Sequence, residues 1–294
     1  MSGFMKKVRP KLHSLASSFY LLQRNTLNKV AIAIICLLLV IAIFGPVFLP
    51  NVDEINQMAS TAEKLLPPSG AHFFGTDELG RDLFLRVMLG TRISLLAGIV
   101  TIAAAVLIGV ALGSVAGFFG GIIDDIVMRL TDMFLGFPSL LLAMTIATFM
   151  GPSLRNALIA CVISWWPSYT RIVRNQAVSI RGRQFVRASE AIGAPSYFII
   201  LKHIIPNTLA PVIVQVSLDI GNVIMTLASL SFLGLGAQSP TPEWGLLVST
   251  SRNYFLNAWW YTIFPGMAIF ITVLAFNLIG DGLREILDPR TRKN

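Results

Sequence analysis

Uncharged apolar runs alternate along the chain with shorter polar segments. The runs cover residues 30–50, 93–123, 133–154, 156–170, 203–218 and 253–280. The fifth run continues past Asp219 without another charge until Glu243. Because a helix needs roughly 20 mostly apolar residues to cross a bilayer, the pattern predicts six transmembrane helices. The fourth run is the shortest of the six, and its ability to cross needs separate support.

The positive charges between the runs supply that support. With six spans and a cytoplasmic N-terminus, 17 of the 23 Lys and Arg residues fall on the cytoplasmic side and six on the other. Loops in the cytoplasm are enriched in Lys and Arg. If 156–170 did not cross, the basic segment 171–202 would lie outside. We therefore expect six spans with the N- and C-termini in the cytoplasm.

Composition agrees with an all-α integral membrane protein. The chain is 54% hydrophobic and 13% charged, whereas soluble domains contain about 25% charged residues. Its net charge of +8 gathers in blocks beside the apolar runs, which favours contact with anionic membrane lipid over nucleic acid. Cys36 and Cys161 both lie inside apolar runs, so neither a disulfide framework nor a zinc site is indicated. The first run is too long for a signal-peptide core, and no A-x-A cleavage pattern follows it, so we expect it to be retained.

These segments define the expected organisation of the chain. It comprises a cytoplasmic N-terminal segment 1–29, a first transmembrane helix 30–50, an extracytoplasmic loop 51–92, a five-helix core 93–288 with a cytoplasmic loop 171–206, and a cytoplasmic tail 289–294. The outer loop is too long for a tight turn, and we expect it to be compact in itself. A second outer loop, 234–245, is rich in Gly and Pro, which favour turns over helix.

Four possible metal ligands gather in the first outer loop. His72, Asp77, Glu78 and Asp82 lie within AHFFGTDELGRD. One His with scattered carboxylates does not form a metal site. We expect a folded, hydrogen-bonded loop and predict no metal or cofactor.

A stripe of small residues marks the second run. Gly109, Gly113, Gly117 and Gly121 recur at every fourth position, which places them on one helix face. Such a face permits close helix packing in lipid. The expected role is packing within the chain, and the alternative is an interface between subunits.

Asp219 is the one acidic residue well inside a predicted span, and Asn222 follows three positions later on the same helix face. An ionisable group inside the membrane normally faces a cavity or a partner. One hypothesis is that Asp219 and Asn222 line a translocation path and attract a cationic group or metal. The other is that Asp219 is a structural hydrogen-bond partner of another helix.

The stretch RQFVRASEAIGAPSYFIILKHIIPN (183–207) has a helical rhythm in an otherwise apolar region. Phe185, Ala188 and Ile192 fall at helical spacing, and Gly193 is placed to end the helix in the left-handed conformation. Pro195 prevents the helix from simply continuing. The pattern predicts a short amphipathic helix on the cytoplasmic face. It can rest on lipid headgroups or insert into a groove on a partner, and its mixed charges favour the partner.

Motifs of enzymes are absent from the sequence. It contains no G-x-x-x-x-G-K-[ST] for binding nucleotide phosphates and neither G-x-S-x-G nor H-E-x-x-H. We therefore predict that the chain is not an enzyme and does not carry its own P-loop ATPase.

The stretch around Gly193 resembles the cytoplasmic signature of binding-protein-dependent ABC importer permeases. That signature is E-A-A, three residues, Gly, nine residues and I-x-L-P. Alignment on Gly193 places its first part at Arg187, Ala188 and Ser189 and its last part at 203–206. The acid of the signature is Arg187 in this chain, and Glu190 is a candidate for a displaced acid.

Three further stretches resemble the dipeptide, oligopeptide and nickel branch of these permeases, and specifically the second permease subunit of each pair. They are FGTDELGRDLFLRV (74–87), SLSFLGLGAQSPTPEWG (229–245) and FNLIGDGLREILDPR (276–290). SLDIG around Asp219 is similar to members that take D,D-dipeptides and to members of the nickel type. The resemblance covers nearly the whole chain.

The resemblance implies a fold, a set of partners and a location. The fold would be that of a type I ABC importer permease with a cytoplasmic coupling helix, in a multi-pass protein of the bacterial inner membrane. The partners would be a second homologous permease, two cytoplasmic ABC ATPase subunits and an extracytoplasmic solute-binding protein. The residues expected to couple to the ATPases are Arg187, Ala188, Ser189, Glu190, Ala191, Gly193 and Pro206.

Import of dipeptides or oligopeptides is the function that these features favour. The nearest alternative keeps the same architecture and imports nickel or a metal chelate. An alternative of another class is an ion-coupled secondary transporter that uses Asp219, although the sequence has no obvious inverted repeat of broken helices. A membrane scaffold without a transport role would predict no ATPase partner.

Overall fold

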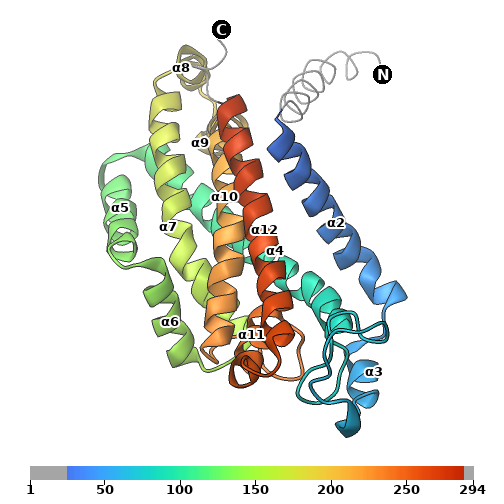
Figure 1. Ribbon diagram of the computed structural model, residues 1–294. Coiled ribbons are helices and arrows are strands. Elements are labelled where there is room, and N and C mark those ends of the chain that lie inside the picture. Colours follow the sequence, from blue (N-terminus) through green and yellow to red (C-terminus); the bar gives the residue numbers. More distant parts are fainter. Residues whose placement is uncertain (1–24, 288–294) are drawn as a thin grey trace.

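The computed structural model describes residues 25–287, and within them the chain forms a helical bundle without β-strands (Figure 1). The longer helices are α2 (Thr26–Phe48), α4 (Leu83–Phe119), α5 (Gly121–Leu135), α6 (Ser139–Met150), α7 (Leu154–Arg181), α10 (Ile205–Phe232) and α12 (Trp259–Leu287). The shorter ones are α3 (Val52–Gln57), α8 (Gln184–Ala191), α9 (Ser196–Ile199), α11 (Trp244–Ser251), 3-10 helices Thr61–Glu63 and Arg252–Tyr254, and a π-helix Ile200–Ile204. The predicted all-α class is confirmed. Most of the predicted N-terminal segment and the whole predicted tail lie outside the described residues.

Four helical stretches in the described residues are long and apolar enough to cross a membrane: Thr26–Phe48, Leu83–Phe119, Ser196–Phe232 and Trp259–Ile286. A fifth is obtained if the bent pair α5 and α6 counts as one span. The predicted run 156–170 lies within α7, which has 28 residues but is not among these stretches. The fold therefore contains four or five apolar spans, and the sixth stays a prediction.

The run 133–154 differs from the single span that we expected. It is divided between α5 and α6, which meet at an angle of 89°. Pro138 separates them, and a proline disfavours the helical conformation of the residue before it. The physical reason for the bend is therefore local, and it places an elbow at residues 136–138 on the surface of the bundle.

Glycines bring α4 and α7 into close contact. A Cβ atom added at Gly113 would lie 2.5 Å from the carbonyl oxygen of Thr170, and one at Gly117 would lie 2.6 Å from the Cβ of Ala177. At Gly109 the same atom would clash with the Cβ of Tyr169. These glycines therefore pack within the chain, as expected. Gly121 differs, because it begins α5 with φ +53° and has open space around its Cα.

The largest buried apolar cluster lies where α7 meets its neighbours α4, α6 and α10. Small residues allow this close approach, and α6 and α7 contribute a set of fully buried ones: Ala143, Ala147, Ala157, Ala160 and Cys161. Tyr169 and Val173 of α7 fill the space beside α4 and are also fully buried. The position of α7 is thus determined from three sides, and the site described below depends on it.

The two ends of the bundle differ (Figure 1). Residues 49–82 and 233–258, here called the α3 end, form loops and the short helices α3 and α11. Residues 182–204, here called the α8 end, carry α8, α9 and the π-helix. Described residues of the α8 end pack on α4 and α7 through a second buried cluster that contains Phe118, Ile180 and Val186.

The glycine contact generates a stability prediction. Gly113→Ala places a Cβ against the backbone of α7, and overpacking of this kind costs about 1–3 kcal/mol. We expect a lower thermal midpoint in detergent, measured from the monodisperse fraction that remains after heating.

Gly266→Ala in α12 is the matched control, because a Cβ at Gly266 has nothing within 4 Å. We expect it to leave the midpoint unchanged or raised. Equal losses for both variants would contradict a special role of the α4–α7 contact.

Candidate functional site

A cavity of about 500 Å³ lies between the α5–α6 elbow, α7 and α10. Volumes of this order are typical of sites for small molecules. Its lining residues are Phe134, Leu135, Phe137, Ser139, Leu140, Ser164, Trp165, Ser168, Asp219, Asn222, Met225, Thr226 and Ser229. Phe137 is 62% exposed and Leu140 39% exposed, so the elbow wall of the cavity lies at the surface of this chain.

Asp219 lies near the middle of α10, and its carboxylate is held by polar neighbours. The hydroxyl of Tyr169 on α7 donates to Oδ2 at 2.9 Å. Nε2 of Gln215, one turn earlier on α10, lies 3.0 Å from Oδ1 and 3.1 Å from Oδ2. Asn222, three positions after Asp219, lies on the same face of α10. Asp219 is 6% exposed, so the carboxylate is both buried and oriented.

Both hypotheses about Asp219 describe part of this geometry. The bond from Tyr169 makes Asp219 a hydrogen-bond partner of another helix. At the same time Asp219 and Asn222 both line the cavity. The two roles are compatible, because the bonds that hold the carboxylate also fix the direction in which it meets the cavity.

Tyr169 and Gln215 were not among the residues proposed from the sequence. Gln215 had a readable signal, because it precedes Asp219 by four positions and such pairs are neighbours on a helix. Tyr169 had no such signal, since 50 positions separate it from Asp219. Its role follows from the packing of α7 against α10.

The α8 end contains the short helix that the sequence predicts at this position, and only part of this helix packs on the bundle. Val186 is fully buried against α4 and α7. Phe185 is 40% exposed and Ile192 is 84% exposed, and Ala188 is exposed as well. The apolar stripe read from the sequence therefore points away from this chain. An exposed apolar stripe at the tip of a bundle is available to another molecule.

Gly193 ends α8 as expected. It has φ +78°, a conformation that glycine adopts without strain. The N–H of Ala194 donates to the carbonyl of Ser189 at 3.1 Å, which satisfies a carbonyl at the helix end. Pro195 then precedes α9, whose first residue is Ser196. The turn at residues 192–195 is thus well defined.

The other proposed coupling residues are distributed along this surface. Arg187, Glu190 and Ala191 are exposed on α8, and Pro206 is exposed in the first turn of α10. Ser189 is half-buried, and its Oγ lies 3.1 Å from Nε2 of His203 in the π-helix. This bond joins α8 to the segment that leads into α10.

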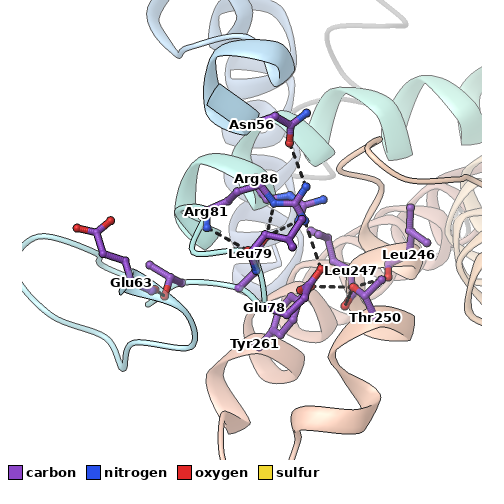
Figure 2. A network of polar contacts seen from close by, with 12 residues as sticks. Asn56, Glu63, Glu78, Leu79, Arg81, Arg86, Leu246, Leu247, Thr250 and Tyr261 are labelled. Carbon is purple, nitrogen blue, oxygen red and sulfur yellow. Dashed lines mark hydrogen bonds and ion pairs between the residues drawn. The ribbon is translucent and has the colours of Figure 1, made fainter. Parts of the chain in front are cut away.

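The α3 end contains a buried network of charges (Figure 2). Asp77 is fully buried, and Arg81 and Arg86 are each 4% exposed. Nε of Arg81 donates to Asp77 Oδ2 at 2.7 Å, and Nη1 of Arg86 donates to the same oxygen. Arg81 also donates to Oδ1 of Asn56 at 3.0 Å. The carboxylate of Asp77 thus joins the loop to the first turn of α4, and Arg81 joins both to α3.

Further bonds attach this loop to the rest of the α3 end. The hydroxyl of Tyr261 on α12 is bonded to Glu78 and lies 2.8 Å from the hydroxyl of Thr250 on α11 (Figure 2). Nδ1 of His72 lies 2.8 Å from Oδ2 of Asp82. The expectation of a folded, hydrogen-bonded loop is therefore confirmed. Within residues 25–287 no group of three or more His, Cys, Asp and Glu is placed to hold a metal.

The second loop of the α3 end docks on α4. Nε1 of Trp244 donates to the carbonyl of Val87 at 2.9 Å. Glu243 caps α11 by accepting from the N–H groups of Gly245 at 2.9 Å and Leu246 at 2.8 Å. Burial raises the pKa of Glu243 above its ordinary value, against the effect of these bonds. The α3 end is therefore a preformed surface.

Comparison with known proteins gives a consistent assignment. Residues 109–293 match the family described as "Binding-protein-dependent transport system inner membrane component". The chain is 48% identical over 275 residues to a probable D,D-dipeptide transport system permease protein, DdpC, of Escherichia coli strain K12, covering 94% of this chain and 91% of that one. It is 38% identical over 293 residues to the oligopeptide transport system permease protein OppC of Bacillus subtilis strain 168, covering 99% and 95%.

A solved structure shares the fold at low sequence identity. The structure titled "Inward facing conformations of the MetNI methionine ABC transporter: CY5 native crystal form" matches with a TM-score of 0.53 and 20% identity. The match covers 66% of this chain and 92% of that chain. At this identity the likeness supports the fold alone.

The charge network of the α3 end generates a second prediction. Asp77→Asn leaves Arg81 and Arg86 buried without their carboxylate, and breaking a buried pair in this way costs about 3–5 kcal/mol. We expect residues 49–82 to become sensitive to protease while the helical bundle remains folded, measured by limited proteolysis of the purified protein with mass spectrometry.

Asp53→Asn removes the same charge from an exposed position of α3 and serves as the control. We expect protease to cleave the Asp53→Asn protein no faster than the wild-type protein. Protease resistance of Asp77→Asn at the level of Asp53→Asn would show that the network does not hold the loop.

Proposed function

We propose that this chain, which belongs to the family of binding-protein-dependent transport system inner membrane components, forms half of the pore of an ATP-driven importer of dipeptides and oligopeptides. Members of this family are transporter permease subunits and not enzymes. The relatives named for D,D-dipeptide and oligopeptide transport match this chain over nearly its full length. That extent of identity favours a peptide cargo over nickel or a metal chelate. The expected set of partners is a second homologous permease, two cytoplasmic ATPase subunits and an extracytoplasmic binding protein.

The observation that carries the coupling role is the exposed apolar stripe of α8. Phe185 and Ile192 stand outside the bundle, while Val186 anchors the same helix to α4 and α7. A helix that is fixed on one face and apolar on the other is suited to a groove on a partner. We assign that groove to an ATPase subunit, with Arg187, Glu190 and Ala191 around the contact.

This assignment determines the orientation of the chain. The α8 end lies in the cytoplasm together with both termini, and the α3 end lies outside, where a binding protein delivers cargo. Six crossings are then required, with α5 and α6 together as the third and α7 as the fourth. The basic residues of the α8 end favour the cytoplasm in this arrangement. The protein is accordingly a multi-pass protein of the bacterial inner membrane.

The cavity beside Asp219 and Asn222 is the proposed translocation path. Its elbow wall is formed by exposed residues of α5 and α6, so a second permease can close it. Closure of two ATPases would move α8 as a rigid body and switch the cavity between outward-facing and inward-facing states, which is coupling between distant sites through two global states. A secondary transporter that uses Asp219 would leave the exposed stripe of α8 without a role.

The coupling role is tested with Ile192→Asp. Ile192 is 84% exposed, so the substitution leaves the fold intact. Loss of one buried apolar side chain costs about 1.5–3 kcal/mol, which lowers binding by about tenfold or more. We expect the variant to insert normally and to lose most of the ATPase that co-purifies with the tagged wild-type protein, measured by quantitative mass spectrometry.

Leu256→Asp is the matched control for that measurement, since Leu256 is 95% exposed at the α3 end. We expect it to retain the ATPase. Normal recovery of ATPase with Ile192→Asp would contradict docking through α8.

The path is tested with cysteine labelling. In a background with Cys36 and Cys161 replaced, Asn222→Cys in the complete complex should react with a small water-soluble thiol reagent, because Asn222 lines the cavity. We expect its labelling rate to change when ATP hydrolysis is arrested with vanadate. Ile43→Cys, which is 65% exposed on α2, should stay unreactive because it faces lipid. Equal, nucleotide-independent rates at both positions would refute a path beside Asn222.

A further inference from the structure

The wall of the cavity beside Asp219 has an unusual chemical character. Among its lining residues Asp219 is the one ionisable side chain, and the other polar side-chain groups are five hydroxyls, the amide of Asn222 and the indole N–H of Trp165. Phe134, Phe137 and Trp165 add three aromatic rings. The lining thus combines one negative charge with aromatic faces, both of which attract a cation.

Three of the five hydroxyls of the wall are already committed as donors. Oγ of Ser164 donates to the carbonyl of Ala160 at 2.9 Å. Oγ1 of Thr226 donates to the carbonyl of Asn222 at 2.9 Å, and Oγ of Ser229 donates to the carbonyl of Met225 at 2.8 Å. A hydroxyl has one hydrogen and two lone pairs. What these three side chains can still offer a ligand is therefore acceptor capacity.

The carboxylate of Asp219 has donors around it but no cation. Its described bonds come from the uncharged groups of Tyr169 and Gln215. The ion pairs among residues 25–287 involve other acids. A charge inside a membrane protein normally has a counter-charge or a cavity that supplies one. The counter-charge of Asp219 must therefore come from outside this part of the chain.

We infer that the cavity receives the protonated amino terminus of the cargo peptide, with Asp219 as its counter-ion and the hydroxyls of Ser164, Thr226 and Ser229 as further acceptors. This inference rests on the proposed function, because it takes the cavity to lie on the path. An ammonium group carries three donors and no acceptor, which matches an acceptor-rich wall. A Ca²⁺ site takes roughly six to eight oxygen ligands, which include carboxylates and carbonyls, so a wall with a single carboxylate is a poor match for it. The carboxylate at the other end of the peptide would be repelled by Asp219. It must therefore face the part of the pore that another subunit supplies.

The inference is tested by uptake into liposomes that contain the complete transporter. Ala-Ala and N-acetyl-Ala-Ala are supplied with binding protein at saturating concentrations, and the maximal rate is measured for each. Because the binding protein is the same throughout, its own selectivity cancels when the ratio of the two rates is compared between variants. We expect Asp219→Asn to lower the rate for Ala-Ala by about tenfold or more, as loss of a charged hydrogen bond implies, and to leave the rate for N-acetyl-Ala-Ala unchanged.

Two further arms sharpen the comparison. N-acetyl-Ala-Lys carries its ammonium group on a side chain. If Asp219→Asn takes up this peptide as fast as the wild-type transporter does, the site is specific for the amino terminus. Asp125→Asn removes a charge from an exposed position of α5 that does not line the cavity, and we expect it to leave the ratio of the two rates unchanged.

The outcomes separate this inference from the proposed function. Equal losses for both cargoes would overturn recognition of the amine while keeping Asp219 on the path. Unchanged rates for both would overturn the inference and count against the path as well.

If the binding protein does not carry the acetylated peptide, a second measurement omits the binding protein. Ala-benzoylphenylalanine is photo-crosslinked to the nucleotide-free complex, with and without N-acetylation, and the label is located by mass spectrometry. We expect the free amine to label residues 134–140, 164–168 or 219–229 in wild type and about tenfold less in Asp219→Asn. Equal labelling of wild type and Asp219→Asn by the free amine would overturn the inference.

Discussion

The close contact between α4 and α7 is the constraint on which the rest of the molecule depends. Gly109, Gly113 and Gly117 leave no room for a side chain between the two helices. Tyr169 lies directly against Gly109, and its hydroxyl holds Asp219 on α10. The same packing continues along α7 to Ile180, which supports Val186 of α8. One contact surface thus positions both the proposed path and the proposed coupling helix.

This arrangement offers a physical route between α8 and the cavity. Val186 packs against the ends of α4 and α7, and Ser189 is joined to His203 in the π-helix that leads into α10. α7 and α10 are also the helices that supply most of the cavity wall. Movement of α8 would therefore act on both walls together, whereas the charge network around Asp77 holds the α3 end as a unit. The proposed function uses both properties, because α8 would transmit movement from an ATPase and the rigid α3 end would receive the binding protein.

Local features of this fold could be predicted from the sequence, and features made by long-range packing could not. The turn at Gly193 follows from local backbone preferences and was confirmed by its φ of +78°. Hydrophobic runs predicted α2, α4, α10 and α12. The run 133–154 was expected to be one helix, although Pro138 within it was a readable signal for the bend.

For the site, Asp219 and Asn222 were identified from the sequence, but the role of Tyr169 depends on a contact across 50 positions. The burial of Val186 likewise depends on the packing of α8 against α4 and α7.

An electron cryo-microscopy map of the complex purified through this chain tests the central claim most directly, namely that α7 and α10 carry the pore wall while α8 engages the ATPase. The account predicts that the elbow at residues 136–138 and the cavity of Asp219 face a second permease across the centre of the complex. It also predicts that Phe185 and Ile192 lie buried in an ATPase subunit. A map in which the cavity opens to lipid at the perimeter, or in which α8 lies on the headgroups without contact to an ATPase, would contradict it.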